Sequence, residues 1–207
     1  PVPKLDKDNR TVEITFYVNP GKRVYVRRIE FKGNTRTEDE VLRREMRQLE
    51  GSWYSQAAID RSKIRLQRLG FFKKVDIETP KVPGVDDQVD MTVSVEEQAS
   101  GSLLFGVGYS ALQKLITSIS VSQNNFLGSG DRIAATIQHS AYLTRYDLSY
   151  FQPYLTDAGI GLGYNLSHRK QDLGDANLAN YLTNSDAFSS YISLPVTETD
   201  SVQLQLG

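Results

Sequence analysis

Apolar and polar side chains alternate almost without interruption from residue 102 to the end of the chain. A period of two is typical of β-strands, because successive side chains point to opposite faces of a sheet. The first such strand divides into an apolar face and a face of mostly small residues: Leu103, Phe105, Val107 and Tyr109 against Leu104, Gly106, Gly108 and Ser110. Further segments repeat this pattern, so the sequence predicts about seven antiparallel strands of roughly ten residues.

The polar face of these predicted strands is small and nearly uncharged, whereas soluble sheets usually carry Lys and Glu there. This favours a transmembrane β-barrel, in which an apolar face meets lipid and a polar face meets a wet lumen. Tyrosines near the segment ends fit the aromatic girdles of such barrels: Tyr109, Tyr142, Tyr150, Tyr154 and Tyr164. A soluble β-sandwich also alternates, with its apolar face inward, so periodicity alone leaves both readings open.

Residues 1–99 predict a mixed α and β structure. Period-two alternation predicts strands at 10–18, 24–32, 71–79 and 88–97. A capping box from Thr37 to Glu40 predicts a helix that runs to Gly51. Ser55 is the predicted N-cap of a second helix, which ends at Gly70. After the first strand, the elements follow the order β-α-α-β-β.

The strand at 10–18 has a counterpart later in the chain. Four apolar positions recur 77 residues on: Val12, Ile14, Phe16 and Val18 become Val89, Met91, Val93 and Val95. Repeats of this kind indicate an array of similar modules. We therefore expect residues 1–20 to be the end of a preceding module, and the chain to be a piece of a longer protein.

Charge separates the two halves of the chain more sharply than its net value of −1 suggests. Residues 1–99 carry 36 charged side chains, whereas residues 100–207 carry 13. No Cys is present, which excludes disulfides and Cys-based zinc sites. The near-neutral balance argues against a globally basic nucleic-acid binder. No apolar run is long enough for a transmembrane helix, and no signal peptide is recognisable, so the chain is cytosolic, mature exported, or an excised piece.

Candidate catalytic residues are lacking. His139 and His168 are far apart in sequence without a third ligand nearby, so we expect no metal site. No Ser nucleophile elbow is present, and the Gly-rich segment 159–163 resembles a strand rather than a phosphate loop. We therefore expect no enzyme activity and no cofactor.

Several motifs resemble the outer-membrane barrel-assembly family, whose members join periplasmic POTRA modules to a β-barrel. The resemblance to the last POTRA module rests on segments 28–34, 41–51, 69–72 and 90–96. The resemblance to the start of the barrel rests on Gly101-Ser-Leu-Leu-Phe-Gly-Val-Gly-Tyr109 and on the turn 125–130. Complete members have several POTRA modules and sixteen strands. The resemblance thus implies a chain that lacks the rest of its barrel, as an odd strand count also indicates.

The implied fold class is an α+β POTRA module (β-α-α-β-β) followed by antiparallel transmembrane β-barrel strands that form an incomplete barrel. The implied domains are residues 1–20, the end of a preceding POTRA module; 21–98, the complete last module; and 99–207, the N-terminal barrel strands. The implied location is the cell outer membrane, with the module in the periplasm.

The resemblance also implies a function, which is to receive unfolded outer-membrane proteins in the periplasm and insert them into the outer membrane. Implied partners are these clients, accessory outer-membrane lipoproteins, periplasmic chaperones and the lipid bilayer, with no nucleic acid. The first barrel strand is the implied gate edge: Ser102, Leu103, Leu104, Phe105, Gly106, Val107, Gly108 and Tyr109. The implied lipoprotein surface comprises Arg43, Arg44, Arg47 and Glu50, which on charge alone form an ordinary solvated face.

Two alternatives remain. One is a related POTRA-barrel transporter that translocates or secretes a dedicated client. The other is a soluble β-rich binding module with an α/β appendage.

Overall fold

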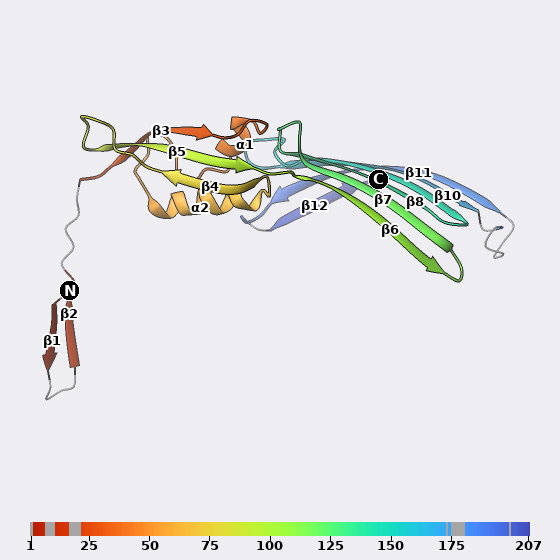
Figure 1. The fold of residues 1–207 in the computed structure, drawn as a ribbon, viewed down its shortest axis with the longest axis horizontal. Coiled ribbons are helices and arrows are strands. Elements are labelled where there is room, and N and C mark those ends of the chain that lie inside the picture. The colour runs from red at the N-terminus through yellow and green to blue at the C-terminus, as the bar shows by residue number, and fades with distance from the viewer. Residues whose placement is uncertain (1, 7–10, 17–21, 173, 175–180, 199) are drawn as a thin grey trace.

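The computed structural model describes residues 2–6, 11–16, 22–172, 174, 181–198 and 200–207. These residues form a small α/β module, a large antiparallel sheet and an N-terminal hairpin that lies apart from both (Figure 1). The module's central strand, β5, passes almost directly into β6, the first strand of the large sheet (Figure 1).

The module has the predicted order of elements. Strands β3 (Tyr25–Lys32), β4 (Phe72–Glu78) and β5 (Gln88–Glu97) form a sheet in which β5 lies between the other two, parallel to β3 and antiparallel to β4. Helices α1 (Asp39–Arg43) and α2 (Gln56–Arg68) pack their apolar side chains on this sheet. The alternating residues of β5 are buried, as predicted: Val89, Met91, Val93 and Val95.

Helix α2 begins and ends where its sequence predicts. The Ser55 Oγ accepts a hydrogen bond from the Ala58 amide at 3.3 Å, which satisfies one free donor of the first turn. Gly70 follows the helix with φ of +73°, a conformation that glycine adopts without strain. On the inner face, Leu66 is completely buried.

The prediction for the first helix is wrong in two respects. Helix α1 ends at Arg43 rather than continuing to Gly51, and Glu38, not Thr37, is its N-cap. The capping box does not form, because the buried Thr37 hydroxyl instead accepts a hydrogen bond from Asn125 Nδ2 at 2.8 Å. The following residues fold as turns, and the Arg47 amide bonds to Ser62 Oγ at 2.8 Å rather than to a helical carbonyl.

The N-terminal hairpin pairs β1 (Val2–Asp6) with β2 (Thr11–Thr15) in antiparallel register. The apolar side chains that follow the repeat are exposed here: Val12, Ile14 and Phe16. Arg10, Tyr17, Val18 and the turn 19–21 lie outside the described residues. The assignment of residues 1–20 to a preceding module therefore remains a prediction.

The large sheet contains the seven antiparallel strands that the alternation predicts, each paired with its neighbour in sequence. They are β6 (Gly101–Ser110), β7 (Lys114–Phe126), β8 (Asp131–His139), β9 (Leu143–Gln152), β10 (Gly161–Asp172), β11 (Leu182–Pro195) and β12 (Ser201–Leu206). The sheet is open, with β6 at one edge and β12 at the other.

The register places side chains of one kind in rows across this sheet. One row crosses six strands on the outer face: Leu103, Val121, Ala135, Leu148, Leu166 and Phe188. The neighbouring row on the inner face holds Ser102, Ser122, Ala134, Ser149, Asn165 and Ser189. The large side chains of the outer row are all 45% or more exposed. An apolar surface of this extent needs a cover, and hydrocarbon fits the strand pattern.

Among the described residues, no helix has the length and hydrophobicity that a membrane span requires.

Candidate functional site

Strand β6 contains all eight residues of the predicted gate strand, 102–109. It pairs with β7 over its whole length, and among the described residues no strand pairs with its other edge. That edge presents a row of backbone N–H and C=O groups to any further strand. Its apolar side chains are strongly exposed, Phe105 at 70% and Val107 at 78%.

The two glycines of β6 have different surroundings. A Cβ at Gly106 would overlap the Ser118 Oγ on the polar face of the sheet, whereas a Cβ at Gly108 would meet nothing closer than 4.0 Å. The absence of a side chain at Gly106 therefore leaves room for the Ser118 side chain on the adjacent strand. Gly108 leaves open space at the edge, and both lower the stiffness of the strand.

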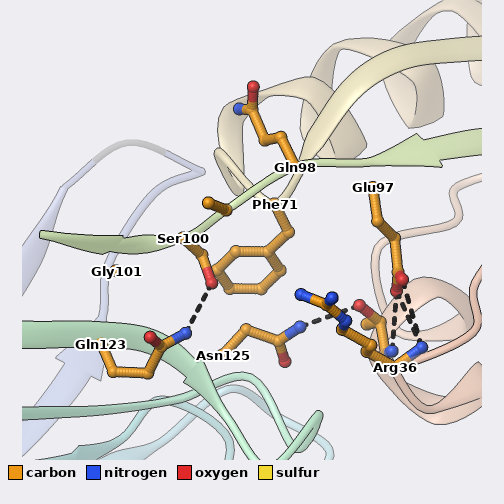
Figure 2. Close-up of a pocket in the computed structure, with 10 residues that line it drawn as sticks. Arg36, Phe71, Glu97, Gln98, Ser100, Gly101, Gln123 and Asn125 are labelled. Atoms are coloured by element: carbon orange, nitrogen blue, oxygen red, sulfur yellow. Dashed lines mark hydrogen bonds between the residues drawn. The ribbon is translucent and has the colours of Figure 1, made fainter.

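The segment between β5 and β6 is anchored on both sides. The Gln98 amide bonds to the Phe71 carbonyl at 2.9 Å, and its side chain to the Gly70 carbonyl at 3.0 Å, both in the module. On the other side, Ser100 bonds through its carbonyl to the Asn124 amide at 3.0 Å and through its hydroxyl to Gln123 at 2.8 Å. A cavity of about 200 Å³ lies beside this junction (Figure 2).

Glu97, the last residue of β5, holds the loop that precedes α1. Its carboxylate accepts hydrogen bonds from the amides of Arg36 at 3.1 Å and Thr37 at 2.8 Å (Figure 2). It also accepts one from the Thr35 hydroxyl at 2.9 Å. Burial alone would raise the pKa of Glu97. The hydrogen bonds from Thr37, Thr35 and Arg36 outweigh it, so the pKa lies below its ordinary value.

The module docks on the connections at the near end of the sheet. In the β7–β8 turn, the Gly128 carbonyl accepts from the Glu38 amide at 3.0 Å, and the Ser129 carbonyl accepts from Arg44 at 3.4 Å. A Cβ at Gly128 would overlap the backbone oxygen of Arg36, so the two parts touch backbone to backbone. In the β11–β12 turn, Glu198 pairs with Arg47 at 3.4 Å.

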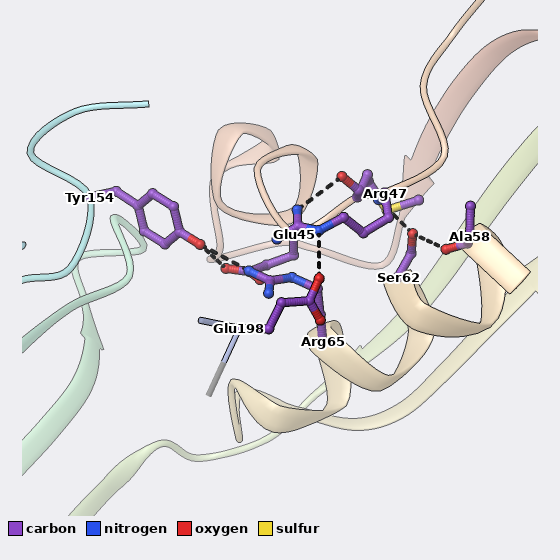
Figure 3. A network of polar contacts seen from close by, with 8 residues as sticks. Glu45, Arg47, Ala58, Ser62, Arg65, Tyr154 and Glu198 are labelled. Carbon is purple, nitrogen blue, oxygen red and sulfur yellow. Dashed lines mark hydrogen bonds and ion pairs between the residues drawn. The ribbon is translucent and has the colours of Figure 1, made fainter. Parts of the chain in front are cut away.

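The β9–β10 connection contributes Tyr154, which sequence reasoning assigned to a girdle. That assignment is wrong, because its hydroxyl reaches an ion pair inside the module (Figure 3). Glu45 and Arg65 pair at 2.7 Å with side chains 5% and 13% exposed. The Tyr154 hydroxyl donates to Glu45 at 3.0 Å and accepts from Arg65 at 3.2 Å. Burial and the Glu45 carboxylate raise the pKa of Tyr154.

The predicted lipoprotein surface divides into two parts. Glu50 accepts hydrogen bonds from the Ile29 amide at 2.7 Å and from Arg43 at 3.3 Å, which keep its pKa below the ordinary value. The Arg43 guanidinium lies over the Phe31 ring at 5.2 Å. Arg44 and Arg47 contact turns of the large sheet. Arg43 and Glu50 instead pair with each other on the module and remain exposed.

The contacts between module and sheet were absent from the sequence predictions. Glu45, Arg65 and Tyr154 are far apart along the chain, and no local pattern links them. A weak signal exists, because Glu45 falls at a position that a helical pattern would bury, and a buried charge requires a partner. Within the described ranges, no three His, Cys, Asp or Glu side chains lie close enough to hold a metal ion.

Comparisons with known proteins agree with this architecture. Residues 24–98 match the POTRA family, described as a surface antigen variable number repeat, and residues 125–207 match the Omp85 superfamily domain. The chain therefore belongs to the Omp85 superfamily, as a POTRA module joined to part of an outer-membrane barrel. This places it in the cell outer membrane, with the POTRA module in the periplasm.

Within this superfamily, the chain is similar to BamA proteins. It is 34% identical over 206 residues to the outer membrane protein assembly factor BamA of Neisseria meningitidis, covering 99% of this chain and 26% of that protein. BamA from Haemophilus ducreyi lacking POTRA domains 1–3 is 38% identical, with a TM-score of 0.85 over 99% of this chain and 38% of that one. CdiB from Acinetobacter baumannii, 16% identical with a TM-score of 0.59, shares the fold. The chain thus spans about a quarter of the length of the curated relative.

Proposed function

We propose that this chain is the part of an outer-membrane protein assembly factor that connects the periplasmic module to the barrel edge where clients are inserted. The names of its relatives support the general activity. The observation that carries the proposal is the edge of β6 with which no other described strand pairs, and which follows the module after only residues 98–100. An unfolded client held near the module would therefore meet the first strand of the sheet at the membrane boundary.

In this proposal, a client strand adds to β6 by β-augmentation. Backbone hydrogen bonds supply affinity without regard to sequence, which suits an activity that serves many clients. The exposed side chains of β6 would continue onto the client's own apolar face. Gly106 and Gly108 let the edge bend as the strands pair.

Client capture at the edge is tested by photo-crosslinking in the full-length protein. A photo-reactive residue replaces Val107 in β6, or Val121 in β7 as the matched control on the same face. We expect an adduct with an arrested outer-membrane client at Val107 and much less at Val121. Equal yields would exclude an edge-specific site.

The same assay separates the proposed activity from a transporter with a dedicated client. Unlabelled, unrelated barrel proteins are added in excess during crosslinking. Competition by all of them supports a general assembly factor, whereas competition by one protein alone supports a dedicated transporter.

We further propose that Arg43 and Glu50 bind an accessory outer-membrane lipoprotein, and that periplasmic chaperones deliver clients to the module. Charge reversal in Glu50→Lys should reduce lipoprotein co-purification. Glu50→Gln keeps an acceptor for the Ile29 amide and separates charge recognition from local folding. Glu96→Lys, on an exposed part of β5, is the control, and unchanged co-purification with both Glu50 variants would remove this assignment.

A further inference from the structure

The orientation of the module relative to the sheet depends on a few contacts of unequal strength. The Arg47–Glu198 pair is 36% and 53% exposed, so water and salt weaken it. The β7–β8 turn supplies a backbone hydrogen bond from Glu38 and the bond between Asn125 and Thr37. The β9–β10 connection supplies a shielded contact, because Tyr154 reaches an ion pair whose side chains are only 5% and 13% exposed.

Tyr154 lies between two guanidinium groups of the module. Arg65 donates to its hydroxyl, while the Arg44 guanidinium stacks over its ring at 4.3 Å from the centroid. Arg44 also donates to the Ser129 carbonyl and so joins the β9–β10 connection to the β7–β8 turn. Both oxygens of Glu45 are engaged, one by Tyr154 and the other by Arg65. A low local dielectric strengthens each of these bonds.

The segment 98–100, which connects the module to the sheet, has the features of a hinge. Gln98 bonds to the module and Ser100 bonds to the sheet, so the two anchoring networks meet at Ala99. Residues 98–100 belong to no helix or strand. A rotation at Ala99 would leave each network intact and, among the contacts of the described residues, would break those at the three turns.

We propose that Tyr154 acts as a catch, a side chain that holds the module docked at the end of the sheet through its contacts with Arg44 and with the Glu45–Arg65 pair. When the catch is lost, the module turns about Ala99 while module and sheet each stay folded. Tyr154 is therefore a positioning residue, which decides where the module lies relative to the free edge of β6. This inference concerns the docking of two parts of the chain and does not depend on the proposed assembly activity.

The test measures one distance between module and sheet in the full-length protein in nanodiscs. Spin labels are placed at Gln67→Cys on α2 and at Leu127→Cys in the β7–β8 turn, after any cysteines elsewhere are replaced. Both positions are exposed. With Tyr154 intact, we expect one narrow distance distribution.

Tyr154→Phe keeps the ring under Arg44 and removes both hydroxyl bonds, and Tyr154→Ala removes everything. Loss of a hydrogen bond to a charged group should raise the ratio of undocked to docked molecules about tenfold or more. We expect a second distance population in Tyr154→Phe and a larger one in Tyr154→Ala. The matched control is Tyr142→Ala, at the far end of the sheet, where the hydroxyl contacts Gln113.

Hydrogen exchange in α2 and the thermal stability of the barrel show whether both parts remain folded. Unchanged values together with a new distance population support a catch. The wild-type distribution in Tyr154→Ala would overturn the proposal, because the other turns would then suffice for docking. Equal broadening in Tyr142→Ala would also overturn it, because the effect would be general loosening.

Discussion

Removing the charge of Glu97 should release the loop before α1 without unfolding the module. In Glu97→Gln, the amides of Arg36 and Thr37 lose a charged acceptor at 3.1 and 2.8 Å, and the Thr35 hydroxyl loses its partner. Hydrogen bonds to charged groups contribute about 1.5–3 kcal/mol each when shielded. Because Glu97 is only half-buried and the amide retains one acceptor, we expect a loss of about 2 kcal/mol of local stability.

Hydrogen exchange measured by mass spectrometry reads this loss directly at residues 36 and 37. A change of about 2 kcal/mol corresponds to roughly 30-fold faster exchange of these two amides. The matched control is Glu96→Gln, because Glu96 is the neighbouring residue and its ion pair with Lys73, at 3.2 Å, is exposed. We expect the control to leave exchange at 36 and 37 unchanged.

Acid should weaken the loop before α1, because it protonates the Glu97 carboxylate. The folded-state pKa of Glu97 lies below the ordinary value of 4.5, so the carboxylate stabilises the loop fully above that value. Its contribution is lost as the pH falls through the lower, folded-state pKa. After correction for intrinsic rates, wild-type protection should persist down to about pH 4.5 and then decline. Equal protection in the wild type and Glu97→Gln at pH 7 would refute the reasoning.

Three substitutions test the packing of the module, the sheet and their junction. Leu66→Ala empties a fully buried site in the module and should cost about 2–5 kcal/mol, measured by urea unfolding followed through α2. Gly163→Ala would overlap the Tyr191 ring, which stacks on Phe151 at 5.7 Å, and should destabilise the sheet by about 1–3 kcal/mol. The barrel should then lose its folded mobility on a gel at a lower temperature than the wild type. Gly128→Ala combines a φ of +89° with a clash against the module and should shift the Gln67–Leu127 label distance, whereas Gly108→Ala, where a Cβ meets nothing closer than 4.0 Å, should not.

Local patterns in the sequence predict the strands of the module's sheet and of the large sheet, because period-two alternation depends only on neighbouring residues. The same patterns predict the cap of α2 at Ser55. They fail for α1, because the Thr37 hydroxyl bonds to Asn125, 88 residues away. The prediction for Tyr154 fails for the same reason, since its partner Glu45 lies 109 residues away. Contacts between module and sheet leave no periodic trace in either segment.

The rows of side chains across the large sheet have a consequence for any strand that adds to β6. The outer row reaches the edge at Leu103, and the inner row reaches it at Ser102. An added antiparallel strand extends both rows only if its own apolar positions fall opposite the apolar positions of β6. A slip by one residue would turn every apolar side chain toward the polar face. The edge therefore accepts strands whose apolar residues point to the same face as those of β6, and it needs no pocket for any individual side chain.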